Sequence, residues 1–100
     1  MKNKELLKTE EPVGRELGRL IFKDVMKTEF LTLEYRAYEA SEEKAPYSIE
    51  VIASNGKNEK SAVLSGAFDL REEAKRFFDL ISRNLVTPVS LSYVYEDYCE

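Results

Sequence analysis

The sequence predicts an α+β domain in which about four antiparallel strands form one sheet, covered by a helix over residues 70–83 and a short helix over residues 89–98. Three observations support this class. Apolar and polar residues alternate along much of residues 30–67, the links between these segments are short enough for hairpins, and a helical apolar stripe follows them. A sheet with one apolar face needs a covering layer, and the first helix supplies it.

Length and composition indicate a single domain. The 100 residues, 43% of them hydrophobic, suffice for a buried core. Residues 1–16 mix both charge signs and are expected to form a flexible tail, leaving residues 17–100 as the domain. No apolar run approaches the roughly 20 residues of a membrane span, and the first residues lack a signal-peptide pattern.

Four segments are expected to be strands. Residues 17–28 fit both a helix and a strand, and their β-branched and aromatic side chains favour a strand over residues 19–26. The alternation is clearer over residues 30–39, 46–54 and 60–67, which we therefore interpret as half-buried strands.

The link between the last two strands contains Asn55-Gly56, a strong signal for a hairpin. A primed turn at this dipeptide requires positive φ at one or both positions. Gly66 lies inside the return strand, where we expect the covering helix to approach the backbone closely.

The helix over residues 70–83 has expected signals at both ends. Asp69 and Glu72 have the spacing of a capping box, and Asn84 is a candidate left-handed stop. Two acid-before-base pairs four residues apart are expected to form ion pairs: Glu72 with Arg76, and Asp79 with Arg83. The apolar stripe consists of Leu70, Ala74, Phe77, Phe78, Ile81 and Leu85, widened by Leu80.

The second helix is expected to begin at a hinge. Pro88 disfavours helical geometry at Thr87, suits a first helical position, and follows a residue able to cap the helix. The apolar face consists of Leu91, Val94, Tyr95 and Tyr98.

Charge and cysteine content limit the partners and the setting. The net charge is −4, of which residues 84–100 supply −3, and no segment is strongly basic. Nucleic acid and an anionic membrane surface are therefore not expected partners. A single cysteine, Cys99, forms no internal disulfide and has acidic neighbours, which favours an inert thiol and a cytoplasmic setting.

The sequence offers no catalytic, cofactor-binding or metal-binding constellation. It contains no histidine, which is the commonest general base near neutral pH and the commonest metal ligand. Adjacent acid pairs such as Glu42-Glu43 point apart on a strand or helix, so they are expected to be solvated. We therefore expect no enzyme, no cofactor and no metal.

One candidate partner face lies on the second helix. At 100° per residue, Tyr93 falls opposite the apolar face, among Glu96, Asp97 and Glu100. A single exposed tyrosine on a surface is ordinary. An aromatic ring among carboxylates also suits an arginine, so the functional interpretation is a face that docks a basic surface of another protein.

The C-terminal run Pro88-Val89-Ser90-Leu91, followed by Val94, Glu96, Asp97 and Tyr98, resembles the ending of a small family from Clostridium-type Firmicutes. Residues 33–39 and 47–51 are similar to two strands of that family, with Ser48 where the family often has glycine. The resemblance covers about 70 residues from Phe30 onward. It implies a compact domain in a bacterial cytoplasm, and, because the family is a domain of unknown function, no activity or ligand.

The sequence thus favours a non-enzymatic protein-interaction or regulatory module. The sequence gives a homodimer and a monomer equal odds. In a homodimer, Glu34 and Arg36 on the outer face of strand 30–39 are candidates to pair crosswise between the two copies. The alternative is a small-ligand-binding protein with a pocket between sheet and helix.

Overall fold

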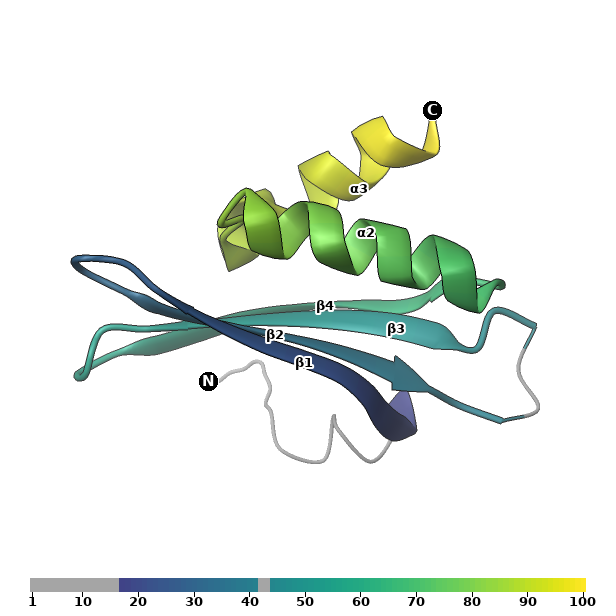
Figure 1. Ribbon diagram of the computed structural model, residues 1–100, viewed down its shortest axis with the longest axis horizontal. Helices are drawn as coiled ribbons and strands as arrows, with labels where there is room; N and C mark the ends of the chain where they lie inside the picture. The colour runs from purple at the N-terminus through teal and green to yellow at the C-terminus, as the bar shows by residue number, and fades with distance from the viewer. Residues whose placement is uncertain (1–16, 42–43) are drawn as a thin grey trace, which may run out of the picture.

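A four-stranded antiparallel sheet with helices on one face makes up the computed structural model, which describes residues 17–41 and 44–100 (Figure 1). The elements are β1 (Arg19–Lys27), β2 (Thr32–Glu39), β3 (Tyr47–Ser54), β4 (Glu59–Phe68), α2 (Arg71–Arg83), the 3₁₀ turn η1 (Pro88–Ser90) and α3 (Leu91–Cys99). The strands follow one another in chain order across the sheet. The expected fold class is confirmed, while the expected tail of residues 1–16 lies outside the described residues.

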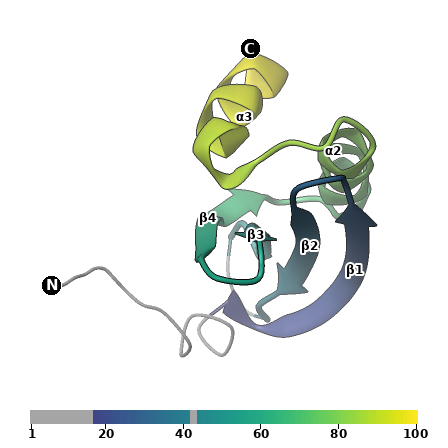
Figure 2. The same ribbon diagram turned by 90° about the vertical axis from the view of Figure 1, so that its left-hand side faces the viewer.

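The strand register places the apolar positions of the sheet toward the helices. Leu33, Tyr35 and Ala37 of β2 lie opposite Ala53, Val51 and Ile49 of β3. Both helices lie on the same side of this sheet, as Figure 2 shows. The ambiguous segment at residues 17–28 forms strand β1, with a bulge between Leu20 and Phe22.

The β3–β4 hairpin differs in detail from the expected turn. Gly56 has φ +92°, which confirms the expected positive φ, but four residues separate the paired Ser54 and Glu59. The side-chain oxygen of Asn55 accepts hydrogen bonds from the backbone N–H groups of Lys57 and Asn58, at 3.0 and 2.8 Å. This side chain therefore organises the turn.

Gly66 does not mark an approach of the helix, and that expectation is wrong. Its φ is +58°, and a methyl group added there would lie 3.4 Å from the carbonyl oxygen of Ala45. Its N–H donates to the Ser48 hydroxyl at 2.9 Å. Gly66 thus allows the backbone conformation that the irregular pairing of β4 with β3 requires near residues 44–46.

The start of α2 is not the capping box that the sequence predicts. The N-cap residue is Leu70, in extended conformation, without a side-chain cap bond, and 58% of its surface is exposed. Asp69 therefore lies one residue too early to cap the first turn. Leu70 also does not join the buried stripe.

The end of α2 is a Schellman-type turn centred on Leu85, whose φ is +53°, while Asn84 keeps a negative φ. The backbone N–H of Val86 donates to the Ile81 carbonyl at 3.0 Å, and that of Leu85 to Ser82 at 3.3 Å. The predicted stop at Asn84 is thus displaced by one residue. The Asn84 side chain instead donates to the Leu80 carbonyl at 2.7 Å.

The ion pairs on α2 use partners other than the expected ones. In the described part of the chain, Lys75 pairs with Asp79 at 2.7 Å and Arg76 with Glu73 at 3.7 Å. One pair is four residues apart and the other three. Because both spacings bring side chains together on a helix, a basic residue has more than one acid within reach.

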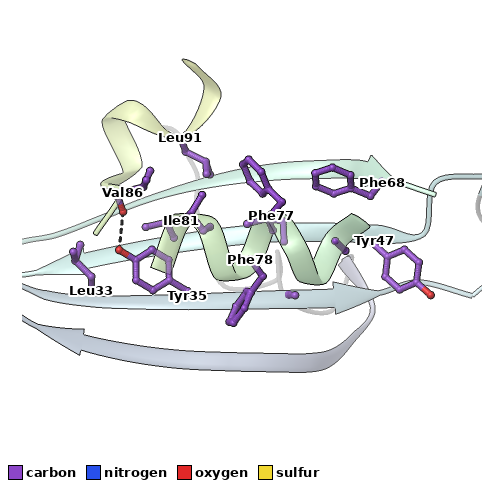
Figure 3. Packing of buried hydrophobic residues seen from close by; sticks show 13 residues of the cluster. Leu33, Tyr35, Tyr47, Phe68, Phe77, Phe78, Ile81, Val86 and Leu91 are labelled. Carbon is purple, nitrogen blue, oxygen red and sulfur yellow. Dashed lines mark hydrogen bonds between the residues drawn. The ribbon is translucent and has the colours of Figure 1, made fainter. Parts of the chain in front are cut away.

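The core lies between α2 and the sheet (Figure 3). From α2, Ala74, Phe77, Phe78 and Ile81 are buried, and Phe77 and Ile81 have no exposed surface. The expected stripe is confirmed at these four positions, while Leu80 and Leu85 are 38% and 44% exposed.

The predicted hinge and second helix are confirmed. Thr87 is extended, Pro88 takes the first position of η1, and α3 follows at Leu91, which is 1% exposed. The Thr87 side chain makes no cap bond to the backbone, so its expected capping role is wrong.

Candidate protein-interaction surface

The inner face of α3 packs on an aromatic cluster. Tyr95 and Tyr98 lie edge-on to Phe68 and Phe77, with ring centroids 5.2–6.0 Å apart. The Tyr95 hydroxyl donates to the Ala67 carbonyl at 2.7 Å, and burial raises the pKa of Tyr95. These contacts fix the rotation of α3 about its axis.

The outer face of α3 carries the predicted partner residues. Tyr93 is 68% exposed, and Glu96, Asp97 and Glu100 are exposed as well. Their spacing of three and four residues places them along one side of the helix. In the described ranges, no ion pair involves these three carboxylates. We call this set the α3 face.

A hollow of about 390 Å³ lies at the foot of α3. We call it the Pro88 groove. Its apolar walls come from Leu31, Ala53, Pro88 and Val89, and polar residues including Lys60 line its side toward the β3–β4 hairpin. Three separate segments thus converge: the start of β2, the hairpin and η1. Sequence reasoning missed this groove because its walls come from residues up to about 60 positions apart.

A polar network lies on the opposite face of the sheet. Glu50 is only 8% exposed and accepts a hydrogen bond from the Tyr38 hydroxyl at 2.7 Å. Arg36 donates to Glu34 and to Tyr38, at 2.6 and 3.3 Å, and its Nη1 lies 3.8 Å from Glu50. Burial raises the pKa of Tyr38, and the bond to Tyr38 raises that of Arg36.

Within one copy this network already pairs Glu34 with Arg36, and their crosswise pairing between two copies stays a prediction. Strand β2 lies inside the sheet between β1 and β3, and the two side chains pair with each other. The burial of Glu50 is a feature that the sequence reasoning missed. The strand register could have indicated this burial, because it places Arg36 directly opposite Glu50 on β3.

A second hollow, of about 450 Å³, lies between β1 and α2. The guanidinium of Arg71 lies 5.1 Å from the ring centroid of Phe22, and the ammonium of Lys75 lies 5.4 Å from it. Glu72 and Asp79 also line it, so its charge is mixed. The space beneath α2 itself is filled by Phe77 and its neighbours.

Across residues 17–41 and 44–100, no group of three His, Cys, Asp or Glu side chains is arranged to hold a metal ion. No helix in these ranges is long and apolar enough to cross a membrane. Cys99 is an exposed, free thiol.

Comparison with known proteins yields one match. The model of a family of unknown function (DUF6514) matches residues 20–100. No curated protein and no solved structure matches the chain. The resemblance to a family of unknown function is therefore confirmed. The family model matches from residue 20, ten residues before Phe30, where the resemblance in the sequence begins.

Proposed function

The chain belongs to DUF6514, a family of unknown function, and on that premise we propose that it is a non-enzymatic protein-interaction module whose α3 face binds a basic surface of another protein. One observation carries this proposal. Tyr93 stands 68% exposed on a helix whose opposite side is fixed in the core, among carboxylates without a cationic partner in the described residues.

Electrostatics supports a cationic partner. The last turn of α3 contains no basic residue, and residues 84–100 contain no Lys or Arg at all. Acids near a helix C-terminus oppose the helix dipole, each by about 0.3–1 kcal/mol. A cation of the partner offsets this cost, and an arginine also stacks on the Tyr93 ring while it pairs with an acid.

Residue chemistry supports a role in binding rather than in catalysis. The chain contains no histidine, and its buried carboxylate Glu50 is held by Tyr38 and Arg36 on the far side of the sheet. The space beneath α2 is filled by core side chains, and the hollow between β1 and α2 is an open surface feature lined by charges of both signs. Both observations favour interaction over the alternative of a small-ligand pocket between sheet and helix. We place this function in the cytoplasm, on the support of the single unpaired cysteine.

The test compares capture of partners by tagged protein at low and high salt. Tyr93→Ala and Asp97→Lys should each weaken capture of basic proteins, most strongly at low salt, because surface charges are screened by salt. Glu72→Lys is the matched control, since this exposed acid lies on the β1 side of α2. The melting temperature of Tyr93→Ala should stay within about 2 °C of the parent, while that of Asp97→Lys should rise and that of Glu72→Lys should fall by a few degrees, because these charge changes favour the dipole of α3 and oppose that of α2. A loss of several degrees for Tyr93→Ala would place Tyr93 in the core and contradict the proposal.

Self-association is a second candidate function. Strands β1 and β4 are the outer strands of the described sheet, so each has one side without a strand neighbour there. Such edges pair readily with a second chain unless protected. Sedimentation velocity at high micromolar concentration tests this, and a monomer there would exclude it.

A further inference from the structure

We propose that the Pro88 groove is the anchor site for an apolar side chain of the partner, so that the recognised segment is an extended basic peptide with one large apolar residue. This inference rests on the proposed function of the α3 face and adds the chemistry and spacing of its partner.

The groove leaves apolar surface in water. Val89 on its wall is 73% exposed, and Phe30, next to the wall residue Leu31, is 78% exposed. A large exposed apolar side chain on the wall of a hollow, such as Val89, is typical of a protein-binding site. A single apolar anchor that fills such a hollow supplies a large share of binding energy in many interfaces.

The groove and the α3 face are continuous. The 3₁₀ turn η1 passes directly into α3 at Leu91, and Tyr93 follows Val89 by four residues. Residues four apart on a helix are surface neighbours. A peptide with its anchor at Val89 therefore passes over Tyr93 before it reaches the carboxylates.

The spacing of the peptide follows from helix geometry. Asp97 lies eight residues after Val89, which is about 12 Å along a helix. An extended peptide covers about 3.3 Å per residue, so its first basic residue belongs about four positions from the anchor. Glu100 lies three residues and about 4.5 Å further, which corresponds to between one and two peptide positions, and a second cation two positions later stays on the same side of the peptide.

The charges at the two ends of the surface determine on which side of the anchor the basic residues of the peptide lie. Lys60 lines the groove on its hairpin side, while the α3 side carries only acids. A cation in the peptide is repelled by Lys60 at the hairpin end of the surface and attracted by the acids at the α3 end. The partner's basic residues must therefore lie on the α3 side of its anchor.

The experiment measures binding of fluorescent peptides by anisotropy at low salt. The anchored probe is Leu-Ser-Gly-Ser-Arg-Ser-Arg, made also with Phe or Trp in place of Leu. One control peptide has Ser in place of the anchor, and another has Glu in place of both Arg residues. The protein variants are Val89→Ser in the groove, Asp97→Lys on the α3 face, and Leu20→Ser as a control at an apolar site that is 46% exposed on β1.

The inference predicts that at least one anchored probe binds the parent about tenfold tighter than the Ser peptide, because its anchor is buried. Val89→Ser should remove that advantage and leave the Ser peptide unchanged, while Leu20→Ser changes neither. If the anchored and Ser peptides bind equally and Asp97→Lys weakens both, the anchor site is wrong and the proposed function stands. If the Glu peptide binds as well as the Arg probe, or if no basic peptide binds at millimolar concentration, the proposed function is wrong as well.

Discussion

The hydroxyl of Tyr35 donates a hydrogen bond of 2.9 Å to the backbone carbonyl of Val86, 51 residues further along the chain (Figure 3). Tyr35 has no exposed surface and lies on the inner strand β2. Val86 lies in the linker between α2 and α3. This bond therefore ties the helical layer to the sheet at the point where the chain turns toward the α3 face.

Tyr35→Phe should lower the free energy of unfolding by about 1–3 kcal/mol, because it leaves the Val86 carbonyl without its buried donor. Urea unfolding followed by circular dichroism measures this. Tyr93→Phe, at an exposed tyrosine, should change stability by less than about 0.5 kcal/mol. Equal effects of the two variants would contradict the role of the bond.

Stability should fall at alkaline pH. Burial, and then the negative charge of Asp24 opposite it, raise the pKa of Tyr35 from 10.0 to about 12. The folded state therefore holds a proton that the unfolded state releases, and the free energy of unfolding falls as pH rises from 10.0 to about 12. Below pH 10.0 the contribution of Tyr35 is complete.

Ultraviolet titration of the phenolates checks this directly. Tyr35→Phe should remove one phenol that ionises near pH 12, while Tyr38, Tyr47 and Tyr95, whose pKa values are also raised, still ionise late in the titration. The variant should also lose stability less steeply over this range. A titration unchanged by the substitution would assign the late step to another tyrosine.

Phe77→Ala should destabilise the protein by about 3–5 kcal/mol, the range for a large buried aromatic residue. Its ring is fully buried and lies within 5.3 Å of the Phe68 ring centroid and 5.2 Å of that of Tyr98. Leu70→Ala is the control, since that side chain is 58% exposed. An effect of Phe77→Ala below about 1 kcal/mol in thermal or urea unfolding would mean that α2 packs by another face.

Leu85→Gly should leave stability unchanged or raise it by about 1 kcal/mol. Leu85 has φ +53°, a conformation that is unfavourable by about 1–2 kcal/mol for an ordinary residue and free of strain for glycine. Its side chain is 44% exposed, so its removal costs little burial. Arg76→Gly, in the interior of α2, should instead cost about 1 kcal/mol. A loss above about 1 kcal/mol for Leu85→Gly would show that its side-chain contacts outweigh the strain.

Gly56→Val should lower stability by about 1–2 kcal/mol, because Gly56 has φ +92°. No atom lies within 4 Å of the position that a Cβ would take, so the cost is one of backbone conformation rather than of a clash. Gly56→Asn is the matched variant and should cost less, since asparagine tolerates this region better. Thermal unfolding compares them, and equal losses would point to a different cause.

Local periodicity was enough to predict much of this structure. The alternation over residues 30–39 predicted a half-buried strand, which is β2, and the spacing in α2 identified Phe77, Phe78 and Ile81 as buried. A side chain's face within a strand or helix depends only on its position in the repeat, so one chain segment contains that information. The same reasoning placed Tyr93 on the outer side of α3.

Features that depend on distant segments were decided by the tertiary structure. Glu50 falls on the polar side of the β3 alternation, yet Arg36 and Tyr38 from the neighbouring strand enclose it. The walls of the Pro88 groove, Leu31 and Val89 among them, likewise come from segments far apart in the chain.

The end of α2 shows most clearly why tertiary contacts can override a local preference. By local preference Asn84 is the better left-handed residue, yet Leu85 takes that conformation. The sequence by itself determined that the helix ends here, through Pro88 and the end of the apolar stripe. The exact residue was selected by the packing of Val86 in the core and its bond to Tyr35, because these contacts outweigh a local preference of about 1–2 kcal/mol.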